Sequence, residues 1–226
     1  MKKLAIVGIL LYSIIFSNVM FVTAEEAKEG RQEESTNTPN LAENATSAIL
    51  MERDTGTILF EKNAHEQLPP ASMTKSMTML IMMEEIDKGR LSLDEKIRVS
   101  ERASSMGGSQ IFLEAGEEMT VEDLLKGIAI ASGNDASVAI AERISGSEEA
   151  FVQRMNEKAK ELKLKNTKFQ NSSGLPAKDH YSTAYDMAIM AKELLKYDMI
   201  TEYTSIYEDY LRKGQKNEFW LVNTNK

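Results

Sequence analysis

The chain has 226 residues, of which 42% are hydrophobic and 27% charged, and this composition is typical of one soluble globular domain. Its formal net charge of −8, without a basic cluster, makes it a poor nucleic-acid binder, so we expect no nucleic-acid partner. The absence of cysteine excludes disulfides, thiol catalysis and cysteine metal sites. The two histidines, His65 and His180, lack the spacing of a metal motif, so we expect no zinc site.

The N-terminal segment predicts export. Two lysines open the chain, residues 4–22 are mostly apolar, and residues 22–24 (Val-Thr-Ala) resemble a small-residue cleavage site. We interpret residues 1–24 as a secretory signal peptide. The alternative is an uncleaved membrane anchor, because the apolar run is near spanning length, but three polar residues interrupt it and we favour cleavage. In either case the rest of the chain is expected to work outside the cytoplasm.

Residues 25–44 are polar and charged, with almost no large apolar side chain, which is typical of a disordered linker. A globular domain is predicted over residues 45–226. It begins with two strand-like runs, 48–51 and 57–60, around a turn in which Gly56 can adopt a positive φ. Residues 54–56 also spell the Asp-Thr-Gly triplet of aspartic proteases. That chemistry requires two carboxylates sharing a proton, and the chain has no second copy, so we favour the turn.

The most informative helix follows Pro69-Pro70. From Met73 to Ile86 the residues are apolar almost all the way round, which predicts a buried helix that ends near Gly89. The later predicted elements, in chain order, are an extended piece within 91–100, a loop at 106–110, a capped helix from Thr120, a helix from near Asp135 to Gly146, a helix at 150–164, an extended piece at 166–169, a turn at 171–176, a helix from Thr183 to Tyr197 and a strand at 219–222.

Ser72 and Lys75 lie one helical turn apart, on one face, where this buried helix begins. A serine hydroxyl is a weak nucleophile until a base removes its proton. A partly desolvated lysine has a lowered pKa and can act as that base, while the helix N-terminus offers N–H groups to an oxyanion. The spacing therefore indicates an acylation device, although an isolated serine before a helix is more often an N-cap.

A second polar cluster, Ser132-Gly133-Asn134, lies at the break between two predicted helices. If this elbow faces Ser72 and Lys75, the Ser132 hydroxyl can relay a proton to a leaving amine, and the Asn134 amide can hold a substrate carbonyl. The alternative, a cap followed by a turn, would be favoured if the cluster stood alone.

Together the two motifs resemble the penicillin-binding and serine β-lactamase superfamily, whose motifs are Ser-x-x-Lys, Ser-x-Asn and Lys-Thr-Gly. Their flanks resemble the low-molecular-mass D-alanyl-D-alanine carboxypeptidases from about residue 45 to the last residue. The stretches that carry this resemblance are 54–63, 70–75, 107–109, 132–136, 173–175 and 180–188.

The resemblance implies an α/β (α+β) transpeptidase-like fold, with an antiparallel sheet flanked by helices and a helical lobe. It implies that Ser72 attacks the bond between the terminal D-alanines of a peptidoglycan stem peptide, with Lys75 as general base, Ser132 as proton shuttle and Asn134 as substrate-binding residue. Water then releases the acyl-enzyme, without a metal or cofactor. β-Lactam antibiotics would acylate Ser72 as substrate mimics, at the outer face of the cytoplasmic membrane or in the cell wall.

One departure from the family pattern is that no Lys-Thr-Gly occurs in the chain. We therefore expect the sequence to stop before this motif, without the later sheet strands, the C-terminal β domain and the membrane-binding tail. Such a polypeptide is expected to be poorly active and unstable, because a lone hairpin is marginal. The alternative functions are a class A-like β-lactamase, for which we find no convincing deacylating glutamate, and a catalytically inactive cell-wall-binding relative.

Overall fold

The computed structural model describes residues 41–225. The predicted signal peptide and residues 25–40 of the predicted linker lie outside the described residues, and residues 41–44 form a turn.

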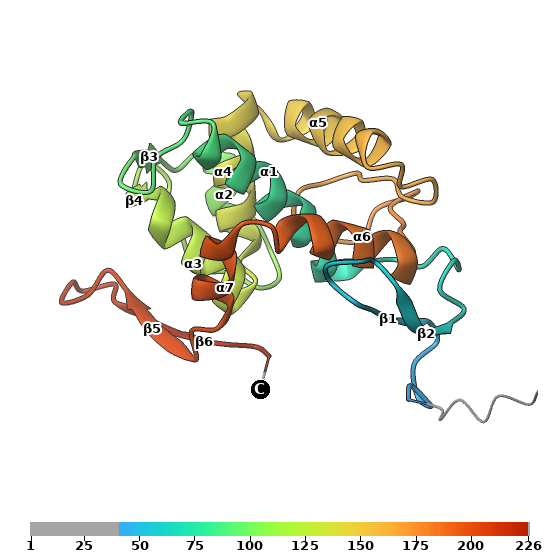
Figure 1. Ribbon diagram of the computed structural model, residues 1–226. Coiled ribbons are helices and arrows are strands. Elements are labelled where there is room, and N and C mark those ends of the chain that lie inside the picture. Colours follow the sequence, from blue (N-terminus) through green and yellow to red (C-terminus); the bar gives the residue numbers. More distant parts are fainter. Residues whose placement is uncertain (1–40, 226) are drawn as a thin grey trace, which may run out of the picture. The chain divides into compact units, whose positions relative to one another are not determined.

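Strands and helices are mixed along the chain (Figure 1). The strands are β1 (Ala48–Met51), β2 (Ile58–Lys62), β3 (Lys96–Arg98), β4 (Glu118–Thr120), β5 (Glu208–Leu211) and β6 (Phe219–Val222). The helices are the 3-10 turn η2 (Ala71–Thr74), α1 (Lys75–Asp87), α2 (Glu101–Ser104), α3 (Val121–Ala131), α4 (Asn134–Ser145), α5 (Glu148–Glu161), α6 (Ala184–Leu194) and α7 (Asp198–Thr204).

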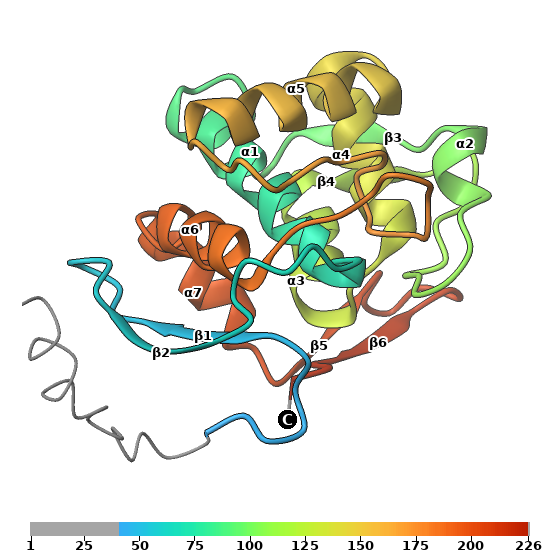
Figure 2. The same ribbon diagram turned by 90° about the vertical axis from the view of Figure 1, so that its right-hand side faces the viewer.

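Helix α1 forms the centre of the helical group. It contacts α3, α4, α5 and α6 and runs between them (Figures 1 and 2). Most of its apolar side chains are almost completely buried, including Met77, Leu80 and Ile81, and burial of this kind is the main stabilising contribution to a fold. The helix ends before Gly89, which has φ +66°. The predicted buried helix is therefore confirmed, with its first residue at Lys75 rather than Met73.

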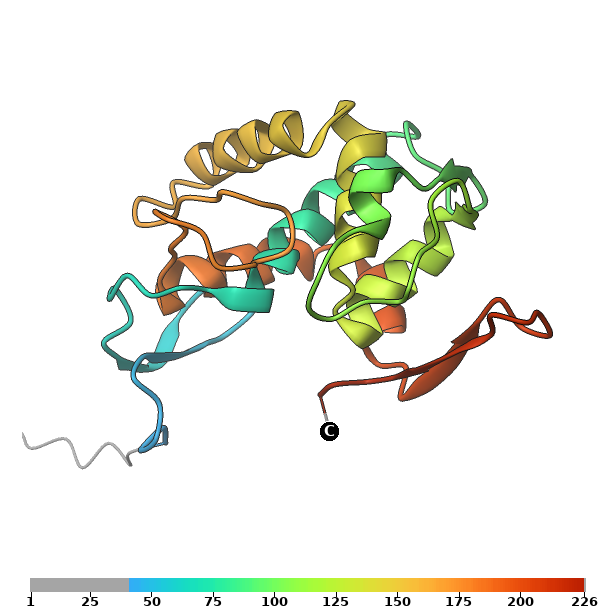
Figure 3. The ribbon, with the colours of Figure 1, turned by 180° about the vertical axis from the view of Figure 1, so that it is seen from behind.

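Each of the strands in residues 41–225 pairs in a two-stranded antiparallel ladder, β1–β2, β3–β4 or β5–β6. The β1–β2 and β5–β6 hairpins both lie along the lower side of the helical group, towards opposite ends of it in the views of Figures 1 and 3. At the β1–β2 turn the Glu52 carboxylate accepts hydrogen bonds from the N–H groups of Asp54 and Thr55, and Gly56 has φ +76°. The Asp-Thr-Gly triplet is thus a hairpin turn, as predicted.

The predicted elements in the rest of the chain are largely present. Thr120 caps α3, Thr183 caps α6, and Gly146 ends α4 in a left-handed conformation. The predicted strand at 219–222 is β6. The predicted extended piece at 166–169 contributes only an isolated bridge between Lys168 and Tyr181. Strands β4 and β5 and helices α2 and α7 were not predicted, because these short segments give no clear periodicity.

None of the helices within residues 41–225 combines the length and the apolar character that crossing a membrane requires.

Candidate active site

The nucleophile candidate Ser72 lies on a short 3-10 turn that leads directly into α1. The turn follows Pro69-Pro70 and opens at Ala71, which has φ +46°. Ser72 is exposed, and its hydroxyl caps neither η2 nor α1. The structure therefore does not support the interpretation of Ser72 as an ordinary N-cap.

Lys75, the first residue of α1, points into the protein and is only 2% exposed. Its Nζ donates to the Asn134 Oδ1 at 2.7 Å and to the Ser173 carbonyl oxygen at 2.7 Å, and it lies 3.4 Å from the Ser72 Oγ. A protonated lysine has three donors and no acceptor. These contacts match all three donors and place the amine beside the hydroxyl.

Burial lowers the pKa of Lys75 from 10.5 to about 8, and the nearby Asp135 carboxylate opposes part of this shift. The cause is desolvation, which disfavours the charged amine. With a pKa near 8, about a tenth of the amine is neutral at pH 7, compared with well under a thousandth for an ordinary lysine. Lys75 can therefore accept a proton near neutral pH.

The predicted elbow lies against this amine. The chain turns between α3 and α4 at Ser132, which has φ +57°, and the turn is tight because the Gly133 N–H donates to the Gly127 carbonyl at 2.9 Å. A Cβ at Gly127 would lie 2.7 Å from the Ile111 Cδ1, so glycine permits this close packing. Asn134 then begins α4 with its amide directed at Lys75.

Asn134 also fixes the loop at residues 107–109. Its Nδ2 donates to the Gly107 carbonyl at 2.7 Å, and its backbone N–H donates to the Ser109 carbonyl at 2.8 Å. Gly108 has φ +80°, and a Cβ there would lie 2.7 Å from the Asn134 Nδ2. This loop, for which spacing alone favoured a plain surface loop, is therefore a wall of the site.

Ser132 lies two residues from Asn134 and is half-buried. Within residues 41–225 its hydroxyl is not joined by a hydrogen bond to Ser72 or Lys75. The structure thus brings Ser72, Lys75 and Asn134 into contact and places Ser132 on the same elbow. The catalytic roles of all four residues stay predictions.

Asp135 is a buried residue of the site that the sequence analysis did not identify. Its carboxylate, 1% exposed, accepts hydrogen bonds from the backbone N–H groups of Ile111 and Leu113 at 3.1 Å. A carboxylate in the first turn of a helix is also stabilised by the helix dipole. Asp135 therefore holds the segment after Gly108 against α4 and leaves Asn134 free to contact Lys75.

The loop 171–174 supplies the carbonyl that binds Lys75. Ser172 is fully buried, its hydroxyl donates to Glu148 at 2.9 Å, and its carbonyl accepts from Thr78 at 2.7 Å. Glu148 is in turn paired with Arg102 at 2.9 Å. From the sequence we predicted a turn here and a family resemblance at 173–175, but not the contact to Lys75, because a backbone carbonyl has no side-chain signature.

Gly174 fits this loop against the nucleophile turn. It has φ +89°, and a Cβ at this position would lie 1.8 Å from the Ala71 carbonyl oxygen. No other residue can occupy the position without moving one of the two main chains.

The described residues offer no ready metal ligand set, since no group of three or more His, Asp or Glu side chains gathers within residues 41–225. The polar groups around Lys75 are an amide, a hydroxyl and a carbonyl, and the nearby Asp135 carboxylate is occupied by backbone N–H groups.

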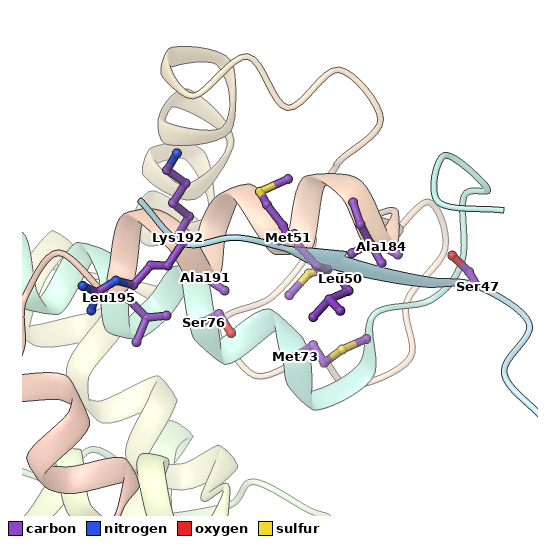
Figure 4. Close-up of a pocket in the computed structure, with 13 residues that line it drawn as sticks. Ser47, Leu50, Met51, Met73, Ser76, Ala184, Ala191, Lys192 and Leu195 are labelled. Atoms are coloured by element: carbon purple, nitrogen blue, oxygen red, sulfur yellow. The ribbon is translucent and has the colours of Figure 1, made fainter. Parts of the chain in front are cut away.

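An apolar pocket of about 510 Å³ lies elsewhere, between β1, α6 and the start of α1 (Figure 4). Leu50, Met51 and Met73 line it together with Ser76 and Ala191, and neither Ser72 nor Lys75 does. The pocket and the polar site are thus on different sides of the same turn.

Comparison with known proteins agrees with this arrangement. Residues 32–226 match the sequence profile of peptidase family S11, described as D-alanyl-D-alanine carboxypeptidase. The chain is 61% identical to the D-alanyl-D-alanine carboxypeptidase DacF of Bacillus subtilis over 216 residues, which cover 96% of this chain and 55% of the relative. It is 38% identical to DacC of Escherichia coli over 193 residues, covering 80% and 48% of the two chains. The chain thus spans about half the length of the curated relatives it matches.

Solved structures are similar too. The penicillin binding protein 6B of Escherichia coli has a TM-score of 0.75 at 34% identity, over 80% of this chain and 58% of that one. The carboxypeptidase DacD of Francisella tularensis has a TM-score of 0.72 at 39% identity, over 73% and 40% of the chains. These similarities confirm the predicted transpeptidase-like fold class.

Proposed function

Since the chain belongs to the D-alanyl-D-alanine carboxypeptidase family S11, we propose that it carries the acylation centre of a serine-type D-Ala-D-Ala carboxypeptidase that acts on peptidoglycan stem peptides. The predicted resemblance to low-molecular-mass penicillin-binding proteins is confirmed at the level of the family. The observation that carries the proposal is the buried Lys75 amine, which has a pKa near 8 and lies 3.4 Å from the Ser72 hydroxyl.

In the proposed reaction the neutral Lys75 amine takes the proton of Ser72 as its Oγ attacks the carbonyl carbon of the penultimate D-alanine. The tetrahedral intermediate collapses, the peptide C–N bond breaks, and the terminal D-alanine leaves after its nitrogen has gained a proton. The Ser132 hydroxyl is proposed to relay that proton from Lys75. Water then hydrolyses the ester on Ser72.

Asn134 is proposed to bind the substrate while it holds Lys75. Its Oδ1 accepts from the lysine and its Nδ2 donates one hydrogen to the Gly107 carbonyl. An amide nitrogen has two hydrogens, so one donor is left for a substrate carbonyl. The contact between Asn134 and Lys75 therefore leaves Asn134 able to fill its predicted role in substrate binding.

β-Lactams are proposed to acylate Ser72 by the same attack, because their strained amide takes the place of the peptide bond. We further propose that the protein is exported and works at the outer face of the cytoplasmic membrane or in the cell wall, which is where its polymeric substrate lies. This proposal rests on the predicted signal peptide at residues 1–24.

The test uses the protein expressed from its complete gene. Fluorescent penicillin should label the wild type covalently, and the protein should release D-alanine from a D-Ala-D-Ala peptide. Ser72→Ala should abolish both activities. Ser76→Ala is the matched control, because Ser76 lies on the next helical turn but faces the apolar pocket, and it should keep both.

Three outcomes would contradict the proposal. Labelling that persists in Ser72→Ala would exclude this serine as nucleophile. Rapid penicillin turnover without D-alanine release would favour the β-lactamase alternative. Binding to cell-wall material without either activity, in wild type and variant alike, would favour the inactive relative.

A further inference from the structure

His180 lies at the junction between the nucleophile turn and the loop that binds Lys75. The imidazole is 7% exposed and packs edge-on against Phe169, with ring centroids 6.0 Å apart. Its Nε2 lies 2.9 Å from the Thr74 Oγ1, and its Nδ1 lies 3.3 Å from the Gln170 backbone nitrogen. Both ring nitrogens therefore have partners, although from the sequence His180 was weighed only as a metal ligand and as part of the stretch 180–188 that carries the family resemblance.

The two partners define the tautomer of the ring. The Gln170 N–H can only donate, so the Nδ1 of His180 must be the acceptor and carry no hydrogen. The hydrogen of the neutral ring is then on Nε2, and this N–H donates to the Thr74 hydroxyl. Only the neutral form with this tautomer satisfies both contacts.

The contacts join two parts of the site. Thr74 is completely buried and lies between Ser72 and Lys75 in the chain. Gln170 immediately precedes the loop 171–174, whose Ser173 carbonyl accepts from Lys75. The ring thus bridges the segment that carries the nucleophile and the segment that holds the base.

We propose that His180 is a positioning residue, and that only its neutral form holds the Ser72–Lys75 pair in place against the loop 171–174. This inference rests on the proposed function, since it concerns the acylation of Ser72. One additional proton, taken up by the His180 ring and not by a group that contacts the substrate, then disables the acylation centre.

Protonation would place a hydrogen on the His180 Nδ1, opposite the Gln170 N–H, so that two donors would face each other. It would also bury a positive charge, which is costly without a partner. Burial alone lowers the pKa of His180 below its ordinary 6.5.

Within residues 41–225 no charged side chain offsets this cost, because burial alone accounts for the lowered pKa of His180. The charged neighbours on the connected segments, Lys168, Lys178 and Asp179, are all exposed, and Lys168 and Asp179 lie 3.8 Å from each other. The buried Glu148, which contacts the loop 171–174 from α5, is bound to Ser172 and Arg102. Lys75 is bound to Asn134 and Ser173. The charged ring is therefore expected to break its contacts rather than gain a counter-ion.

The consequence is a steeper acid limb in the pH dependence of acylation. Below the pKa of Lys75, the rate is expected to fall about tenfold per pH unit, because the neutral amine becomes scarcer. Below the pKa of His180, loss of the second group should add a further factor of about ten per pH unit. The plot of log rate against pH should bend from a slope near one to a slope near two.

The test compares His180→Gln with the matched control His65→Gln in the protein expressed from its complete gene, by the rate of labelling with fluorescent penicillin between pH 4.5 and 8.5. Glutamine can accept from Gln170 through its oxygen and donate to Thr74 through its nitrogen, but it does not titrate. His180→Gln should label at a rate close to wild type near pH 7 and keep a slope near one at low pH. His65 is exposed, so His65→Gln should retain the bend.

If His180→Gln is labelled well but its plot of log rate against pH bends like that of the wild type, the inference is overturned and the proposed function stays intact. Absence of any labelling of the wild type would instead contradict the proposed function. If His180→Gln does not fold, 15N NMR of the wild-type imidazoles decides. His180 should be an Nε2–H tautomer that titrates below 6.5, and an Nδ1–H tautomer or a pKa at or above that value would exclude the proposed role.

Discussion

The helices of this chain begin in two different ways. Helices α2, α3, α5 and α6 start with a serine or threonine whose hydroxyl accepts the N–H three residues on; these caps are Ser100, Thr120, Ser147 and Thr183. Helices α1 and α4, which bear Lys75 and Asn134, start without a side-chain cap, as does the short α7.

The difference separates structural hydroxyls from those available for chemistry. A cap hydroxyl is committed to one backbone N–H and stabilises its helix by about 1 kcal/mol. Ser72 precedes α1 in a similar way in the sequence, but the 3-10 turn η2 intervenes and its hydroxyl lies beside Lys75 instead. The uncapped helix starts are stabilised by tertiary contacts, such as the Asp135 carboxylate at α4.

Replacing the base should have the largest effect on the uncapped site. Lys75→Met keeps an apolar stem of similar length but removes the amine, so the rate of penicillin acylation should fall about a thousandfold. Lys88→Met, at the exposed end of the same helix, is the control and should label at the wild-type rate. A Lys75→Met variant that labels within threefold of the wild type would show that another group activates Ser72.

Gly174→Ala tests how tightly the loop 171–174 is fitted against η2. The added Cβ would overlap the Ala71 carbonyl, at 1.8 Å, so the free energy of unfolding should fall by at least about 3 kcal/mol. Gly146→Ala has a similar positive φ but open space around it, so its cost should be only about 1–2 kcal/mol. Urea unfolding measures the loss of stability in both variants. Equal losses would mean that the loop 171–174 can move away from η2 at little cost in free energy.

Asn134→Asp tests how a charge at position 134 changes the pKa of Lys75. A carboxylate at this position would favour the charged amine, raise the pKa of Lys75 and lower the acylation rate at pH 7 about ten- to a hundredfold. The pH dependence of acylation shows the direction of the pKa shift. With a raised pKa of Lys75, the lost rate should return at higher pH as the amine deprotonates. A uniform loss at every pH would indicate damage to the loop at Gly107 instead.

The smallest expected effects distinguish the capped start of α5 from the uncapped start of α1. Ser147→Ala removes a cap bond of 3.1 Å and should lower the free energy of unfolding by about 1 kcal/mol. Ser72→Ala removes no cap, so its stability should stay within about 0.5 kcal/mol of the wild type. Urea unfolding should therefore rank the two variants opposite to their effects on labelling, and a larger stability loss in Ser72→Ala would indicate that Ser72 does cap α1.

The sequence was most informative where side chains define the structure. The buried helix α1, the hairpin at 48–60 and the Thr120 cap follow from apolar spacing and turn chemistry. Four residues were selected as one constellation: Ser72, Lys75, Ser132 and Asn134. The carbonyls of Gly107 and Ser173 could not be selected, because every residue has one. Asp135 could have been noticed as an acidic residue beside an elbow, but its partners are backbone N–H groups that only the fold brings near.

Burial makes the Lys75 amine a base near neutral pH, and the proposed acylation of Ser72 depends on this property. The direct measurement is the titration of the lysine side chains by 13C NMR, with Lys75 assigned through its loss in Lys75→Met. We expect one lysine to titrate at about pH 8 and its resonance to be absent from the spectrum of this variant. A Lys75 that titrates near 10.5, like an exposed lysine, would contradict it.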